Sequence, residues 1–135
     1  QYISKIRKSL KLISSSRAVK EIEIRTLVIQ EILDSNDVLQ LVKDLIEIPI
    51  DLDKTIYVLE QFTPTPHVLS RSYRYRRKTP IKYLEEAAKQ IKDTYNIKVH
   101  VRVMSKFFND ITKSKDIVKD FKNNRLNPNK WEYLV

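Results

Sequence analysis

Three strand-like runs separated by helix-like segments constrain the fold of this chain more than any other feature. The runs are residues 21–29 (EIEIRTLVI), 55–62 (TIYVLEQF) and 97–103 (IKVHVRV), and the helical segments between them cover 37–48 and 80–95. Strands that alternate with helices form βαβ units, whose strands lie parallel in one sheet. The sequence therefore predicts an α/β fold with three parallel strands alternating with helices, followed by a C-terminal helix over 106–123.

Polar side chains alternate with apolar ones along the first and third runs. Glu23 and Arg25 alternate with isoleucines, and His100 and Arg102 alternate with valines. We expect these four residues, with Gln61 of the second run, on the sheet face away from the helices. Two interpretations of such a face remain open. Buried charges require partners, which indicates a ligand site or an ion-pair network, whereas an open sheet would simply expose them to water.

The composition excludes several classes of site. The 135 residues fit one domain, 1–135. No apolar run approaches the ~18–20 residues of a membrane span, and no signal peptide is visible, so we expect a cytoplasmic protein without a membrane partner. Without cysteine there are no disulfides or thiolate metal sites, and His67 and His100 do not have metal-site spacing, so we expect no metal bound by this chain. Without glycine there is no glycine-rich phosphate loop.

The charge balance indicates an anionic partner. The chain has 26 Lys and Arg against 17 Asp and Glu, a net charge of +9. The densest basic segment is 71–78, in which arginines that can hold phosphates alternate with tyrosines that can stack on bases. Nucleic acid, an anionic cofactor or a protein partner all remain open as its target, and so does simple shielding of the sheet. The candidate residues are Arg71, Tyr73, Arg74, Tyr75, Arg76, Arg77 and Lys78.

The order of three short motifs resembles the second half of radical S-adenosylmethionine activating enzymes. The motifs are EIRT at 23–26, QFTP at 61–64 and VHVR at 99–102, separated by helical segments. The resemblance covers roughly residues 2–104. It is strongest to activases of glycyl-radical enzymes of the archaeal type related to anaerobic ribonucleotide reductase activation. It implies that residues 1–104 form half of a partial (β/α)6 barrel, with 105–135 as a C-terminal helix and tail, and that the chain is part of a longer one.

The resemblance also implies a cofactor and a missing part. Arg25 matches the arginine that binds the carboxylate of S-adenosylmethionine, a role that suits a guanidinium, and Gln61 lies at the barrel mouth, near the cofactor. The family's three-cysteine loop, which binds a [4Fe–4S] cluster, has no counterpart in this chain. The implied function is therefore the C-terminal portion of a radical S-adenosylmethionine enzyme, inactive alone, with a missing N-terminal half or partner protein supplying the cluster. The alternative is a small basic α/β module that binds nucleic acid or a ribonucleoprotein through residues 71–78.

Overall fold

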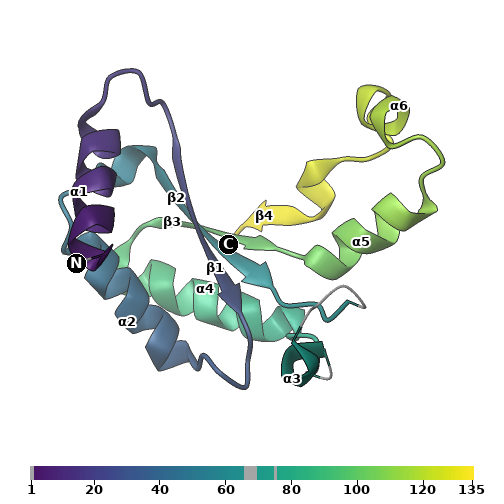
Figure 1. Cartoon of the computed structure of the whole chain (residues 1–135), viewed down its shortest axis with the longest axis horizontal. Coiled ribbons are helices and arrows are strands. Elements are labelled where there is room, and N and C mark those ends of the chain that lie inside the picture. Colours follow the sequence, from purple (N-terminus) through teal and green to yellow (C-terminus); the bar gives the residue numbers. More distant parts are fainter. Residues whose placement is uncertain (1, 66–69, 75) are drawn as a thin grey trace.

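The computed structural model describes residues 2–65, 70–74 and 76–135 and contains one four-stranded sheet (Figure 1). β1 (Ile22–Val28), β2 (Thr55–Gln61) and β3 (Lys98–Arg102) are parallel and adjacent in that order, which confirms the three predicted strands. β4 (Glu132–Leu134) pairs antiparallel with β3. Within the described residues the sheet stays open, with β1 and β4 at its edges, so the half-barrel expectation is met only as a mostly parallel α/β sheet.

Helices α2 (Ser35–Ile46) and α4 (Ile81–Tyr95) pack on one face of this sheet and form the core with it. Their apolar stripes face the valines of β3 and the apolar residues of β2, which is buried along most of its length. Asp34 caps α2 by accepting a hydrogen bond from the backbone N–H of Asp37, at the predicted helix start. Asn96 ends α4 in the left-handed conformation (φ 52°), as the sequence indicates.

The start of α4 differs from the prediction. A threonine followed by proline is typical of a helix start, with the threonine as cap, but α4 begins at Ile81, with Pro80 at the cap position and no side-chain cap. The Thr79 hydroxyl instead donates to the carbonyl oxygen of Val28 at 2.6 Å. Because Thr79 is fully buried beside the end of β1, its hydroxyl needs a partner there, and that need outweighs capping.

The region after β3 also differs from the single predicted helix. It forms α5 (Met104–Lys113) and α6 (Ile117–Lys122), because Ser114 is extended and the side chain of Asp116 caps a new helix at the N–H of Lys119. Val118, which would lie on the apolar stripe of a single helix, is 65% exposed. Further short turns are η1 (Leu52–Lys54), α3 (Arg71–Arg74) and η2 (Pro128–Lys130).

The N-terminal helix α1 (Tyr2–Ser15) packs loosely. Ser14 is its one buried residue, Leu10 touches the core, and Ile3, Ile6 and Ile13 of its apolar stripe are exposed. In Figure 1, α1 lies at one side of the sheet and the α5–α6 segment projects at the other. No helix in the described ranges is both long enough and apolar enough to cross a bilayer.

Candidate functional site

The sheet face opposite α2 and α4 carries a cluster of charged side chains. Paired residues on neighbouring strands point to the same face, and the register places Arg25 with Val58 and His100, and Arg102 with Glu60 and Glu132. We call this set the charged face; its members are Glu23, Arg25, Glu60, His100, Arg102 and Glu132. Four of them were expected there from the sequence.

Arg102 is the centre of the charged face. Its guanidinium donates to Glu132 at 2.6 Å, to Glu60 at 2.7 Å and to Glu23 at 3.1 Å, and His100 lies 2.9 Å from the other Glu132 oxygen. Partial burial on its own would lower the pKa of Arg102, but its hydrogen bonds to Glu132 and Glu60 outweigh the burial and raise it. All three nitrogens of the Arg102 guanidinium are therefore bonded to carboxylates of the chain itself.

Arg25 is the more accessible arginine. Its side chain is 55% exposed, against 18% for Arg102; its Nε donates to Glu23, and Nη1 lies 3.8 Å from Glu60. Burial would raise the pKa of Glu23, but the hydrogen bond from Arg25 and the charge of Arg102 lower it below the ordinary value. Since a guanidinium has five N–H donors, Arg25 keeps donors for a further acceptor.

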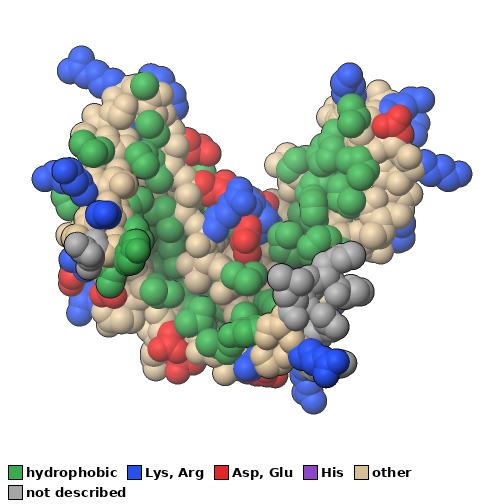
Figure 2. All heavy atoms as spheres, viewed as in Figure 1, with side chains coloured by type: hydrophobic (Ala, Val, Ile, Leu, Met, Phe, Trp, Pro, Cys, Tyr) green, Lys and Arg blue, Asp and Glu red, His purple; other side chains and the backbone are tan. Residues whose placement is uncertain are grey.

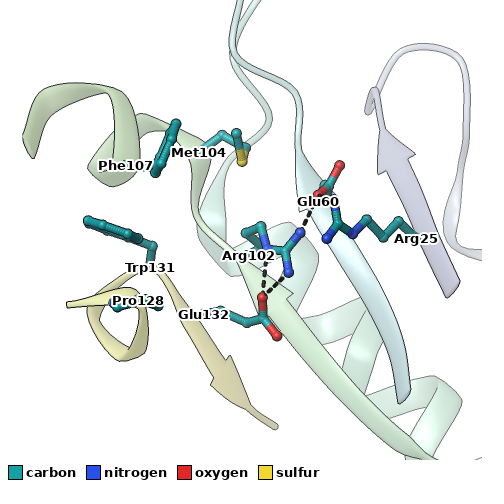
Figure 3. Close-up of a pocket in the computed structure, with 8 residues that line it drawn as sticks. All are labelled: Arg25, Glu60, Arg102, Met104, Phe107, Pro128, Trp131 and Glu132. Atoms are coloured by element: carbon teal, nitrogen blue, oxygen red, sulfur yellow. Dashed lines mark hydrogen bonds and ion pairs between the residues drawn. The ribbon is translucent and has the colours of Figure 1, made fainter. Parts of the chain in front are cut away.

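A cavity of about 300 Å³ opens beside these arginines (Figure 3). Its charged side is formed by Arg25, Arg102 and two glutamates, and its other side comes from the C-terminal segment. Phe107 and Trp131 pack edge to face there, with ring centroids 5.1 Å apart and an interplanar angle of 87°. In the space-filling view the molecule is hollowed between the α1 side and the α5–α6 side, with charged side chains on the floor and hydrophobic ones along the α5–α6 wall (Figure 2). The full lining is Arg25, Glu60, Arg102, Met104, Phe107, Pro128, Trp131 and Glu132.

A second, more open hollow of about 460 Å³ shares Arg102 and Glu132 with the first. It extends over His100 and Glu23 toward the end of β4. The Arg102–Glu132 pair thus lies between two adjoining depressions of the same face, and it holds β4 against β3 at that point.

Gln61 does not belong to this face, contrary to the sequence expectation. It follows the alternation of Tyr57 and Leu59 and is 1% exposed on the helix side. Its amide nitrogen donates to the carbonyl of Thr79 at 2.7 Å, and its amide oxygen accepts from the N–H of Ser105 at 3.0 Å. Gln61 therefore joins the starts of α4 and α5 to the end of β2, and it has no group directed at the cavity.

In the basic segment 71–78, Arg76 is already in contact with other residues of the chain. Arg76 donates to Glu31 at 2.7 Å and lies over the ring of Tyr73, with its guanidinium carbon 5.3 Å from the ring centroid. Arg71, Arg77 and Lys78 are exposed. Tyr75, the side chain of Arg74 and the segment with His67 lie outside the described residues.

Six residues of the cavity are not site candidates from the sequence: Glu60, Met104, Phe107, Pro128, Trp131 and Glu132. Glu60 carried a signal, because a parallel register between the second and third runs sets it opposite Arg102. Pro128, Trp131 and Glu132 depend on the pairing of β4 with β3, for which a three-residue strand after an irregular loop gives no local pattern.

The charges of this face define which ligands it suits. Three carboxylates meet two guanidinium groups, and Lys98 projects from the start of β3 to the same side, so acidic and basic groups are balanced on this face. In the part of the chain that the structure describes, no three His, Asp or Glu side chains are grouped so as to hold a metal ion. The donor set therefore suits an organic ligand with a cationic group for the glutamates, a carboxylate for Arg25 and a flat or apolar part for the aromatic wall.

Comparison with known proteins assigns no family: no family model, curated protein or solved structure matches the chain.

Proposed function

We propose that the charged face binds S-adenosylmethionine, and that this chain is the C-terminal portion of a radical S-adenosylmethionine enzyme of the activase type. The observation that carries the proposal is the cavity of about 300 Å³, in which the half-exposed Arg25 stands beside Glu60 and opposite Trp131. A volume of this order is at the lower end of the range for small-molecule sites.

The chemistry of the lining fits the cofactor group by group. Arg25 would hold the carboxylate, for which a guanidinium provides paired donors. Glu60 and Glu132 would attract the ammonium and sulfonium charges. Phe107 and Trp131 would cover the adenine ring. Gln61 would not contact the cofactor, because its amide is already bonded; it would only support this wall through its hydrogen bond from Ser105 at the start of α5.

The chain cannot hold the cluster of such an enzyme with thiolates, because it contains no cysteine. When bound elsewhere in the complete enzyme, a [4Fe–4S] cluster supplies the electron that cleaves the cofactor reductively. This chain would bind and orient the cofactor, and an upstream half or a partner protein would provide the cluster.

The only tryptophan of the chain lies in the cavity wall, which makes ligand binding directly observable. We expect the fluorescence of Trp131 to change saturably on titration with S-adenosylmethionine. Arg25→Met should weaken binding about 10-fold or more by removing a charge-assisted hydrogen bond, whereas Lys89→Met, on the exposed side of α4, should not. S-adenosylhomocysteine, which lacks the sulfonium charge, should bind more weakly. Absence of any saturable change, or equal effects of the two variants, contradicts the proposal.

A second candidate is nucleic-acid binding through residues 71–78. It is favoured by the exposure of Arg71, Arg77 and Lys78 in a segment without acidic residues. Replacing these three residues by alanine should weaken binding to a single-stranded RNA and reduce the salt dependence of the affinity, because fewer counterions are released. Alanine at Lys5, Lys8 and Lys11 of α1 is the charge-matched control. An unchanged affinity and salt slope in the first variant would exclude the segment as the contact.

A further inference from the structure

β1 is an edge strand whose outer side is unpaired in the described structure. It pairs with β2 along all seven of its residues, and no other strand of the described chain lies beside it. The paired register is continuous, and the strand contains no proline. Such an edge exposes a row of backbone donors and acceptors to any strand that can match it.

The hydrogen bond from Phe62 N–H to the carbonyl of Val28 shows which backbone groups are free. The carbonyl of Val28 points toward β2, and successive residues of a strand alternate in direction. The N–H and C=O groups of Glu23, Arg25 and Leu27 therefore point to the outer side. Only these residues can form the hydrogen-bonded pairs of a new antiparallel neighbour.

The charges on β1 select one partner and one register. In an antiparallel pairing with a second copy of β1, centred on Ile24, Glu23 lies opposite Arg25 of the second copy, and Arg25 lies opposite its Glu23. The two neighbouring registers that satisfy the backbone directions place Glu23 opposite Glu23, or Arg25 opposite Arg25. A parallel pairing of the same two edges would turn one copy over, so that Glu23 and Arg25 of the two copies would lie on opposite sides of the joined sheet and could not pair.

Both side chains are available for this pairing. They project from the charged face, where the Arg25 side chain is 55% exposed and the Glu23 side chain is 29% exposed. Arg25 has one carboxylate at hydrogen-bonding distance, that of Glu23 in its own chain, and so retains donors for a second carboxylate.

We propose that two copies of this chain associate through β1, antiparallel and centred on Ile24, to form one continuous eight-stranded sheet. The two-fold axis would pass through the Ile24 pair and make the contact self-complementary. The charged faces of both copies would lie on the same side of the joined sheet. In a barrel, a further parallel strand would pair with this same edge of β1. The proposed dimer is therefore the state of the chain when no such strand is bound. The dimer does not depend on the proposed cofactor.

Sedimentation velocity over a range of protein concentrations tests the dimer with a charge exchange. Glu23→Arg and Arg25→Glu should each raise the dimer dissociation constant roughly 10-fold or more, because each replaces two attractive pairs by two repulsive ones. The double variant Glu23→Arg, Arg25→Glu restores opposite charges across the interface and should return to within about threefold of the unaltered chain. Glu85→Arg with Lys89→Glu, on α4, is the matched control and should leave the dissociation constant unchanged.

Hydrogen exchange on the unaltered chain locates the contact. The amides of Glu23 and Arg25 should exchange more slowly as the protein concentration rises, whereas the amides of exposed α1 should not. A chain that stays monomeric overturns the inference. So does a dimer in which the double variant has as high a dissociation constant as the single variants, or a dimer in which the amides of Glu23 and Arg25 are not protected. If a single variant fails to fold, the exchange of the unaltered chain decides. The fluorescence of Trp131 reports the cofactor separately, so failure of one proposal is distinguishable from failure of the other.

Discussion

At the scale of single residues, the two arginines of the charged face have different roles. Arg102 is mostly buried and donates to three carboxylates, whereas Arg25 is mostly exposed and donates to one. A partly buried carboxylate that loses its partner remains as an uncompensated charge, which costs far more than the loss of a surface ion pair. Arg102 therefore organises the face, and Arg25 is the residue free to meet a ligand.

This difference predicts unequal costs for the same substitution. Arg102→Met should lower the free energy of unfolding by about 2 kcal/mol, because Glu60 and Glu132 would repel one another without it. Arg25→Met should lower it by less than about 1 kcal/mol. Urea denaturation of the two variants measures both values, and equal costs would show that Arg102 does not organise the cluster.

Glu23 predicts how this face responds to acid. Its pKa is lowered in the folded chain from an ordinary value of 4.5, so the folded state binds this proton less readily than the unfolded state does. Its contribution to stability is therefore complete above that ordinary value and is lost as the pH falls through the lowered folded value. We expect Glu23→Gln to destabilise the chain at about pH 7, and the difference from the unaltered chain to shrink below about pH 4. Urea denaturation at several pH values checks this, and a difference that grows on acidification would contradict it.

At the scale of elements, the C-terminal segment turns an exposed sheet face into a cavity. η2 and β4 bring Trp131 and Glu132 beside β3, and α5 adds Phe107. The indole N–H of Trp131 donates to Asp110 of α5 at 2.8 Å, which ties the two parts of this segment together. The segment lies beyond the motifs at 23–26, 61–64 and 99–102, so the resemblance noted in the sequence does not extend to this wall of the cavity.

The end of α4 offers a test of how a chain without glycine makes its turns. Asn96 is left-handed at φ 52° and supplies the helix stop that glycine usually provides. Asn96→Ala should lower the free energy of unfolding by about 1 kcal/mol, because a Cβ without a local hydrogen bond disfavours this conformation. Asn96→Gly should be neutral or slightly stabilising. Thermal denaturation of both variants checks the order, and an alanine variant as stable as the glycine variant would contradict it.

At the scale of the whole molecule, packing is concentrated around β2, β3 and α4. Leu59, Val101 and Leu84 are fully buried there, whereas α1 buries only Ser14, and α5 and α6 have no fully buried residue. Regions with few buried apolar side chains open locally at a lower free energy than the core does.

Hydrogen exchange should therefore follow a fixed order along the chain. We expect the amides of α1 and α6 to exchange first, those of α5 and β4 next, and those of β2 and α4 last, with the slowest set reporting the global free energy of unfolding. Measurement by mass spectrometry or NMR under native conditions checks the order. Protection of α1 equal to that of α4 would show that its exposed apolar stripe is covered in solution.

The sequence by itself determined the three parallel strands, the two helices that cover them and four of the six residues of the charged face. The spacing of apolar residues has a period of two in 22–28 and 98–102 and a period near 3.6 in 81–95, and such a period shows from neighbouring residues alone that one side of the element is buried. For the same reason the sequence places Glu23, Arg25, His100 and Arg102 together.

Only the tertiary structure decided that the cavity and the fourth strand form, and on which side of the sheet Gln61 lies. β4 forms because residues about thirty positions apart meet in register, and nothing in 132–134 encodes that meeting locally. Gln61 shares its side of β2 with Tyr57 and Leu59, but β2 is apolar on both faces, so its sequence does not show which side the helices cover. On the helix side the buried amide bonds the carbonyl of Thr79 and the N–H of Ser105. Contacts between residues distant along the chain depend on how the elements pack. The periodicity of one element shows that one of its sides is buried, but it does not show which other elements pack there.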